Sequence, residues 1–454
     1  MAKKFLVIML VLLIAFGFGI VGVAFGQSGD DEKSSEKPKF GFNMNLNIGL
    51  SSYEDSSGQQ IAFQKFSFFP EFSYGKLGVG LDLTFEFDGD FKLRDLDNDG
   101  KADTWTKFTD YLYKIYYVRY GHKGDPLYVR AGAIETYTLG HGLIMEGYNN
   151  ILFYPQIHQL GLNVDLDGSL FNFPLIGFES IVDDVLDWDI IGLRVYSRPL
   201  MSLDVPIINQ LKVGASFVTD LDPLEVNDPT NPDYEKYRSP KDNPDSKDNR
   251  VKEFGIDTEV PLLQKGKLSI ISYADYAKIG GKGSGGLIGS TLTYDWFRFI
   301  AQLRFFGKQF VMSYFDPYYE LDRNNPDEGP KYNSLDKITD SYMGYLLGTG
   351  FSILNLLQFQ FSWSDGFNDA EGPRIQSGLS TVEGAIPKID ASFAFDKKDI
   401  DNFKDLFSGA DTIMQLTVGY KVSGMAKIVF IFKRTYTPSG KSTDQTFIET
   451  QFSF

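Results

Sequence analysis

The chain ends with Thr446-Phe447-Ile448-Glu449-Thr450-Gln451-Phe452-Ser453-Phe454. In an extended strand, successive side chains point to opposite faces. One face of this segment would carry Thr446, Ile448, Thr450, Phe452 and Phe454, and the other would carry Phe447, Glu449, Gln451 and Ser453. A strand that is mostly apolar on one face and mostly polar on the other is typical of a wall between hydrocarbon and water.

The same alternation recurs along the chain. Between Phe297 and Phe306, for example, every second residue is apolar, and the intervening positions include Arg298, Gln302 and Arg304. A period of two predicts strands rather than helices. The 40 Phe and 25 Tyr favour strands, and the 45 Gly favour turns. Comparable alternating segments lie at residues 40–51, 81–88, 160–167, 357–364 and 414–421.

Charge and length narrow the class of protein. The net charge of -16 argues against nucleic acid as a partner. A large soluble antiparallel sheet protein, with its apolar faces meeting in a core, is the alternative to a membrane barrel. A soluble sandwich of this length tends to split into domains, and no linker interrupts the strand region. The sequence therefore favours a membrane barrel.

The N-terminus has the pattern of an export signal. Lys3 and Lys4 precede an apolar run that extends to Phe25, and Ala24 and Gly26 are small residues at the positions that signal peptidase inspects. We therefore expect residues 1–26 to be a signal peptide. An uncleaved anchor is the alternative, because the apolar run is longer than usual. Cys is absent, which excludes a lipoprotein and disulfides.

The alternating last segment with its terminal aromatic residue resembles the ending of bacterial outer-membrane β-barrel proteins, of which the porins are an example. The resemblance implies a transmembrane antiparallel β-barrel over residues 40–454 in the outer membrane, surrounded by lipid. It also implies that the assembly machinery recognises Phe454. Residues 27–39 are polar and charged, so we expect a disordered periplasmic lead-in there. A homo-oligomer is compatible with this class.

Short and long connections alternate between the predicted strands. Membrane barrels have short periplasmic turns, long extracellular loops and an even number of strands, so we expect about 18 strands, with 16 to 20 allowed. A barrel of that size can enclose a water channel. Short connections lie at residues 74–78, 121–126, 264–267, 294–296, 354–356 and 423–425. Long polar ones lie at residues 92–110, 139–159, 220–250, 313–340 and 365–372.

If the apolar faces contact lipid, the charged residues between them face the lumen. These are the predicted pore-lining residues Asp82, Glu86, Asp88, Arg130, Arg298 and Arg304. Opposed acidic and basic side chains would create a transverse field that sorts small polar solutes. We therefore expect a porin-like channel for the passive diffusion of small hydrophilic solutes. The alternative is a barrel with a role in adhesion, envelope anchoring or polysaccharide export.

The segment from Thr138 to Asn150 has few charges and several apolar residues and glycines. An apolar loop would be costly in open water, so this loop is predicted to fold into the barrel and narrow it. Packing on its own side chains outside the barrel is the alternative. The residues predicted to form the constriction are Leu139, His141, Met145, Tyr148 and Asn149.

One acidic loop resembles calcium sites. Its oxygen ligands would be the side chains of Asp95, Asp97, Asp99 and Asp103 and the carbonyl of Lys101, with Gly100 allowing a sharp turn. The pattern is similar to the Asp-rich repeats of thrombospondin type 3 and to the first half of an EF-hand loop. Thr106 stands where an EF-hand has Glu. A loop-stiffening Ca²⁺ is therefore predicted, and a solvated acidic loop is the alternative.

Catalytic residues are hard to find in this sequence. The chain has three His residues, His122, His141 and His158, and no nucleophilic Ser motif or paired acid accompanies them. Their spacing does not match that of a metal site. We therefore do not expect an enzyme.

Overall fold

The computed structural model describes most of the chain from Phe40 onward. The described residues are 40–54, 60–95, 102, 105–106, 108–154, 157–227, 237, 250–325, 329–367, 372–382, 384–398, 400, 402–408, 411–424, 426–436 and 442–453. The predicted signal peptide, the lead-in at residues 27–39 and Phe454 lie outside this part of the chain.

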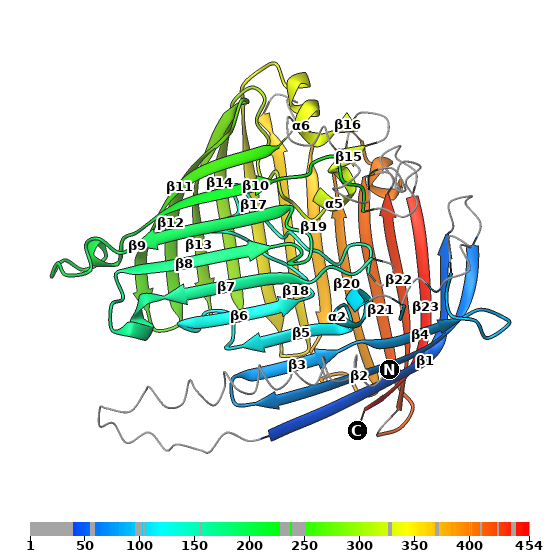
Figure 1. The fold of residues 1–454 in the computed structure, drawn as a ribbon. Coiled ribbons are helices and arrows are strands. Elements are labelled where there is room, and N and C mark those ends of the chain that lie inside the picture. Colours follow the sequence, from blue (N-terminus) through cyan, green and yellow to red (C-terminus); the bar gives the residue numbers. More distant parts are fainter. Residues whose placement is uncertain are drawn as a thin grey trace.

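Antiparallel strands form one closed barrel (Figure 1). The first strands are β1 (Phe40–Glu54), β2 (Gln60–Tyr74), β3 (Leu77–Leu81), β4 (Leu83–Phe87), β5 (Ile115–Tyr120), β6 (Leu127–Gly132), β7 (Gly161–Asp167), β8 (Ile176–Val182), β9 (Ile190–Ser197) and β10 (Lys212–Asp220). They are followed by β11 (Val251–Lys265), β12 (Leu268–Ile279), β13 (Ser284–Tyr294), β14 (Phe297–Phe306), β17 (Tyr342–Ile353), β18 (Leu357–Gly366), β19 (Arg374–Thr381), β20 (Ile389–Lys397), β21 (Thr412–Lys421), β22 (Ala426–Tyr436) and β23 (Ser442–Ser453).

The barrel closes where the last strand meets the first. β23 pairs antiparallel with β1, with Ser453 opposite Asn45 and Ile448 opposite Leu50. β3 and β4 follow one another along β2, so the described residues form a wall that is twenty strands around. Closure gives every strand two neighbours, which the backbone requires in hydrocarbon. The predicted range of 16 to 20 strands includes this number.

The alternation in the sequence sets which side chains face outward. On β14, Phe299, Leu303 and Phe305 are exposed on the outer surface, whereas Gln302 and Arg304 are buried inside. β23 repeats the arrangement: Ile448 is exposed and Glu449 is buried. The apolar rows therefore face outward, as predicted, and do not meet in a core, so the soluble sheet alternative is wrong.

The two rims of the barrel differ. At one rim, here called the short-turn rim, β1 begins and β23 ends. Two-residue connections there begin with Gly75 and Gly266, which take φ angles of 57° and 58°. Such left-handed conformations suit tight hairpins. The opposite, long-loop rim carries the long connections, as the sequence predicts, including residues 88–114, 133–160, 221–250 and 307–341.

Connections from the long-loop rim fill part of the lumen. Met145 and Phe315 are fully buried, form a β-bridge with each other, and share one apolar cluster with inward residues such as Ile181 of β8 and Val218 of β10. Gly192 of β9 leaves room for this packing, because a Cβ atom there would lie 2.7 Å from Cγ2 of Ile181, which packs in the same cluster. The inner face of β8–β13 is thus covered by loops.

Short helical and strand segments lie within these connections, and Figure 1 shows α5 and α6 at the long-loop rim. They are α2 (Phe108–Leu112), α5 (Tyr319–Asp322), α6 (Lys331–Ser334), β15 (Asn324–Asn325) and β16 (Gly329–Pro330), with 3₁₀ turns at Gly168–Phe171, Ile208–Gln210, Leu335–Lys337 and Asp405–Phe407. The described residues include no helix that is both long and apolar enough to cross a membrane.

Candidate functional site: a polar conduit beside the inserted loop

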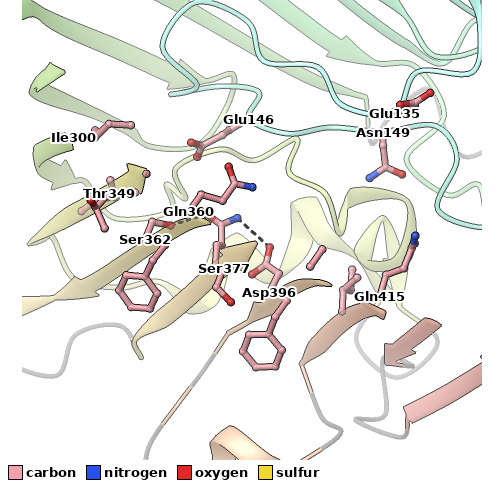
Figure 2. A pocket seen from close by; sticks show the side chains of 18 of the residues that line it. Glu135, Glu146, Asn149, Ile300, Thr349, Gln360, Ser362, Ser377, Asp396 and Gln415 are labelled. Carbon is pink, nitrogen blue, oxygen red and sulfur yellow. Dashed lines mark hydrogen bonds between the residues drawn. The ribbon is translucent and has the colours of Figure 1, made fainter. Parts of the chain in front are cut away.

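A cavity of about 570 Å³ occupies the part of the lumen that the loops leave open. One side is formed by Glu135, Glu146 and Asn149 of the β6–β7 connection, and the other by the inner face of β14 and β17–β22 (Figure 2). The volume falls within the range of about 300–1,000 Å³ that is typical of small-molecule sites. We call this cavity the conduit.

The wall of the conduit combines amide and hydroxyl side chains with apolar ones such as Ile300, Leu346 and Ile413. Inward positions on neighbouring strands place Ser362 opposite Gln376 and Gln376 opposite Asp396. Ser362 Oγ donates a hydrogen bond to Gln376 Oε1 (3.2 Å), and Gln376 Nε2 donates one to Asp396 Oδ2 (3.0 Å), as Figure 2 shows. Other polar side chains in the wall are those of Gln360 and Gln415.

The conduit spans most of the height of the barrel. Arg298 is the second residue of β14, which starts at the short-turn rim. Asp396 is close to the last residue of β20, which ends at the long-loop rim, and Lys433 lies near the same end of β22. Polar lining residues therefore extend from near one rim to near the other.

Charges in the conduit are mostly paired. Arg374 donates two hydrogen bonds to Asp396, at 2.9 and 2.7 Å, and Arg130 lies 3.3 Å from Glu135. Lys433 donates to the carbonyl of Leu152. Within the described part of the chain, the Arg298 side chain has no hydrogen-bond or ion-pair partner. Arg298 is thus the cation that remains available to a solute.

The inserted loop is fastened to the barrel wall by His141. Its Nδ1 lies 2.8 Å from Asp275 of β12 and its Nε2 lies 3.0 Å from Glu259 of β11, and the ring stacks on Tyr273 at 4.3 Å. Burial favours the neutral ring, but hydrogen bonds to the two carboxylates outweigh burial and raise the pKa of His141 to about 9. His141 is therefore charged at neutral pH.

The other loop residues singled out from the sequence have different surroundings. Leu139, Met145 and Tyr148 are buried in the apolar cluster. The Tyr148 hydroxyl donates to Glu320 at 2.5 Å. Asn149 lines the conduit, and its Nδ2 donates to the carbonyl of Pro317 at 3.4 Å.

Of the six residues predicted to line the pore, Arg298 is in the conduit wall. Arg130 lies behind the wall and holds Glu135, and it also donates to the Ala133 carbonyl at 2.9 Å. Arg304 is buried and donates to Gln302 at 2.9 and 2.7 Å. These two arginines support lumen side chains and do not line the conduit.

The three acidic residues predicted to line the pore, Asp82, Glu86 and Asp88, do not line the conduit. Asp82 and Glu86 are buried. Glu86 accepts hydrogen bonds from Ser51 Oγ (2.7 Å) and Arg94 (2.6 Å), so it links β1 to β4 and the segment after it. Asp88 accepts the backbone amides of residues 90 and 92, both at 2.9 Å, and caps a turn.

Several conduit residues were not singled out from the sequence, namely Gln360, Gln376, Asp396, Gln415 and Lys433. Their signal was the polar phase of the alternation in β18–β22. The alternation shows that these side chains point into the barrel. It does not show whether they line the conduit or are buried under a loop, because the covering loops are distant in the sequence.

The predicted calcium loop is only partly described, whereas both remaining histidines are described. Asp97, Asp99, Lys101 and Asp103 lie outside the described residues, whereas Asp95 lies within them. His122 is in an exposed turn next to Asp125. The His158 ring packs edge-on against Tyr154 at 4.9 Å, so its contacts differ from those of His141.

Comparison with known proteins finds likeness in structure. The chain is similar to OpdL of Pseudomonas aeruginosa (8% identity, 92% and 99% of the two chains, TM-score 0.34), OccAB2 of Acinetobacter baumannii (10%, 92% and 98%, 0.35) and the outer membrane protein OprD of P. aeruginosa (9%, 93% and 95%, 0.33). No protein-family model and no curated relative matches the sequence.

Three features of the chain define its class. The sheet is closed, large apolar side chains cover the outside, and the part of the lumen that stays open carries charged, amide and hydroxyl side chains among apolar ones. A closed barrel with this inside-out polarity is suited to lipid around it and water within it. The protein therefore has the architecture of a transmembrane antiparallel β-barrel.

Proposed function

We propose that this protein is a porin-type channel through which small hydrophilic solutes cross the outer membrane by passive diffusion. The observation that carries the proposal is the conduit, whose polar lining extends from Arg298 near one rim to Asp396 near the other. Solutes would enter at the long-loop rim, which corresponds to the extracellular side in such barrels, and leave at the short-turn rim.

The lining suits solutes that carry hydrogen-bonding groups. Amides and hydroxyls such as those of Gln360, Ser362 and Gln415 can both donate and accept, so they can replace part of the water around a polar solute. On the loop side, Glu135 and Glu146 face the strand wall that carries Arg298 (Figure 2). The resulting transverse field would orient dipolar solutes in the narrow section.

Conductance in a planar bilayer tests the proposal. Ser362→Trp places a large side chain in the conduit and should lower single-channel conductance several-fold. Thr446→Trp is a matched control, because Thr446 is exposed on the outer surface, where an aromatic side chain contacts lipid. A wild-type barrel that conducts no ions, or a conductance that Ser362→Trp leaves unchanged, would overturn the proposal. A silent, correctly folded barrel would favour adhesion, envelope anchoring or polysaccharide export.

A further inference from the structure

Three connections meet at the long-loop rim, away from the conduit, around Arg323. Its guanidinium is fully buried and makes two hydrogen bonds to Asp220, at 2.8 and 2.7 Å. It also lies 3.4 Å from Asp189 in the β8–β9 connection and contacts Glu225 in the β10–β11 connection. Arg323 itself follows α5 in the β14–β17 connection.

Acidic groups outnumber the cation in this cluster. Arg323 donates two hydrogen bonds to Asp220 and another to Glu225, but its single positive charge cannot neutralise all the acids around it. An uncompensated buried carboxylate is costly and needs a proton or a cation. In the described part of the chain, the acids grouped around this one guanidinium are Asp183, Asp187, Asp189, Asp220, Glu225 and Glu320.

Three of these acids have the geometry of a cation site. One carboxylate oxygen from each of Asp187, Asp189 and Glu225 lies within 4.8 Å of the other two. Calcium binds oxygen at about 2.3–2.6 Å, so two ligands of one ion can be up to about 4.6–5.2 Å apart. A single ion placed between the three oxygens can therefore reach all of them.

Asp183 gives a second, independent indication of a ligand. Its side chain is fully buried, and its Oδ2 has no hydrogen-bond partner. Its Oδ1 accepts the backbone amide of Ile190 at 2.9 Å, which holds the carboxylate across the hairpin, beside Asp189. A buried oxygen without a donor is rare in proteins and indicates a missing partner. A cation bound by the neighbouring acids would supply that partner.

We propose that Asp187, Asp189 and Glu225, with Asp183 beside them, bind a Ca²⁺ ion. The donors are all carboxylate oxygens, which suit a hard cation, whereas Zn²⁺ favours His and Cys. Mg²⁺ demands a shorter, near-ideal octahedron and gives up its water reluctantly. The ion joins the β8–β9 connection to the β10–β11 connection, and Arg323 links both to the segment that fills the lumen.

Terbium luminescence tests this site on the purified full-length barrel. Tb³⁺ replaces Ca²⁺ and emits when a nearby aromatic side chain absorbs, and Trp188 lies between two of the ligands in the sequence. The acidic loop at residues 95–103 could bind Tb³⁺ as well. All measurements therefore use the Asp97→Asn/Asp99→Asn background, in which that loop has lost two carboxylates.

The informative variant is Asp187→Asn in this background. Asp187 is only half-buried and does not contact Arg323, so the substitution spares the buried cluster. We expect emission in the background protein that Ca²⁺ displaces at lower concentration than Mg²⁺, and a loss of Tb³⁺ affinity of at least tenfold with Asp187→Asn. Absence of emission in the folded background protein, or emission that Asp187→Asn leaves unchanged, would overturn the proposal. Asp295→Asn, at the short-turn rim, serves as the matched control.

Discussion

Nδ1 of His141 lies 2.8 Å from Oδ1 of Asp275, and this contact joins the inserted loop to the barrel wall. Glu259 on the neighbouring strand holds the other ring nitrogen at 3.0 Å. The two carboxylates come from β11 and β12, on the covered side of the lumen. The loop is therefore held against one half of the barrel, and the conduit runs along the other half.

Raising the pH should loosen this attachment. The pKa of His141 is raised from 6.5 to about 9, so the folded state favours the charged ring. The stabilisation is on the order of 3 kcal/mol, is complete below pH 6.5 and is lost as the pH rises through 9. Bilayer recordings should show a noisier or larger conductance above pH 9 than at pH 7. His141→Gln should show the same behaviour at pH 7, and a conductance that is flat between pH 7 and 10 would contradict this account.

Removing the positive charge of Arg298 should change the ion selectivity of the channel. Arg298 lines the conduit without a partner among the described residues, so Arg298→Gln lowers the positive potential that attracts anions. In a salt gradient, the reversal potential should shift toward cation preference. Lys265→Gln removes a charge at the same rim, from an exposed position on another strand, and should have a smaller effect. Equal shifts for both variants would assign the effect to the net charge of the rim.

Much of the fold was predictable because each strand of a wall between lipid and water alternates apolar and polar residues. This alternation can be recognised within a short segment of sequence. The inward position of Arg298 and the outward position of Phe299 follow from neighbouring residues alone. The cluster around Arg323 was not predictable, because Arg323 and Asp220 are 103 residues apart and meet only when two long loops fold into the rim. Asp82 and Glu86 are a second example. Their inward orientation could be predicted from the alternation, but their burial could not, because it depends on residues from other segments of the chain.

Barrel closure should depend on a buried ion pair. Lys65 Nζ lies 2.6 Å from Glu449, which also accepts a hydrogen bond from Asn47 at 2.7 Å, so the pair joins β2 and β1 to β23. Lys65→Met leaves the Glu449 carboxylate buried with one donor fewer, at a cost of about 3–5 kcal/mol. The temperature at which the purified barrel unfolds in detergent should fall by several degrees. Lys267→Met breaks the exposed pair with Asp295 and should leave this temperature nearly unchanged. Adding Glu449→Gln to Lys65→Met should recover part of the loss, and no recovery would mean that the charge is not the cause.

The last prediction concerns the room that glycine leaves for the inserted loop. A Cβ atom on Gly255 of β11 would lie 2.8 Å from Ile144 Cδ1, closer than side chains tolerate. Gly255→Val should therefore push the loop away from the covered wall and into the conduit, because the strand backbone is fixed by its two neighbours. We expect a lower single-channel conductance with an intact barrel. Gly89→Val is the control, because a Cβ atom there meets nothing within 4 Å. A Gly255→Val barrel that is folded and conducts like the wild type would show that the loop does not limit the conduit.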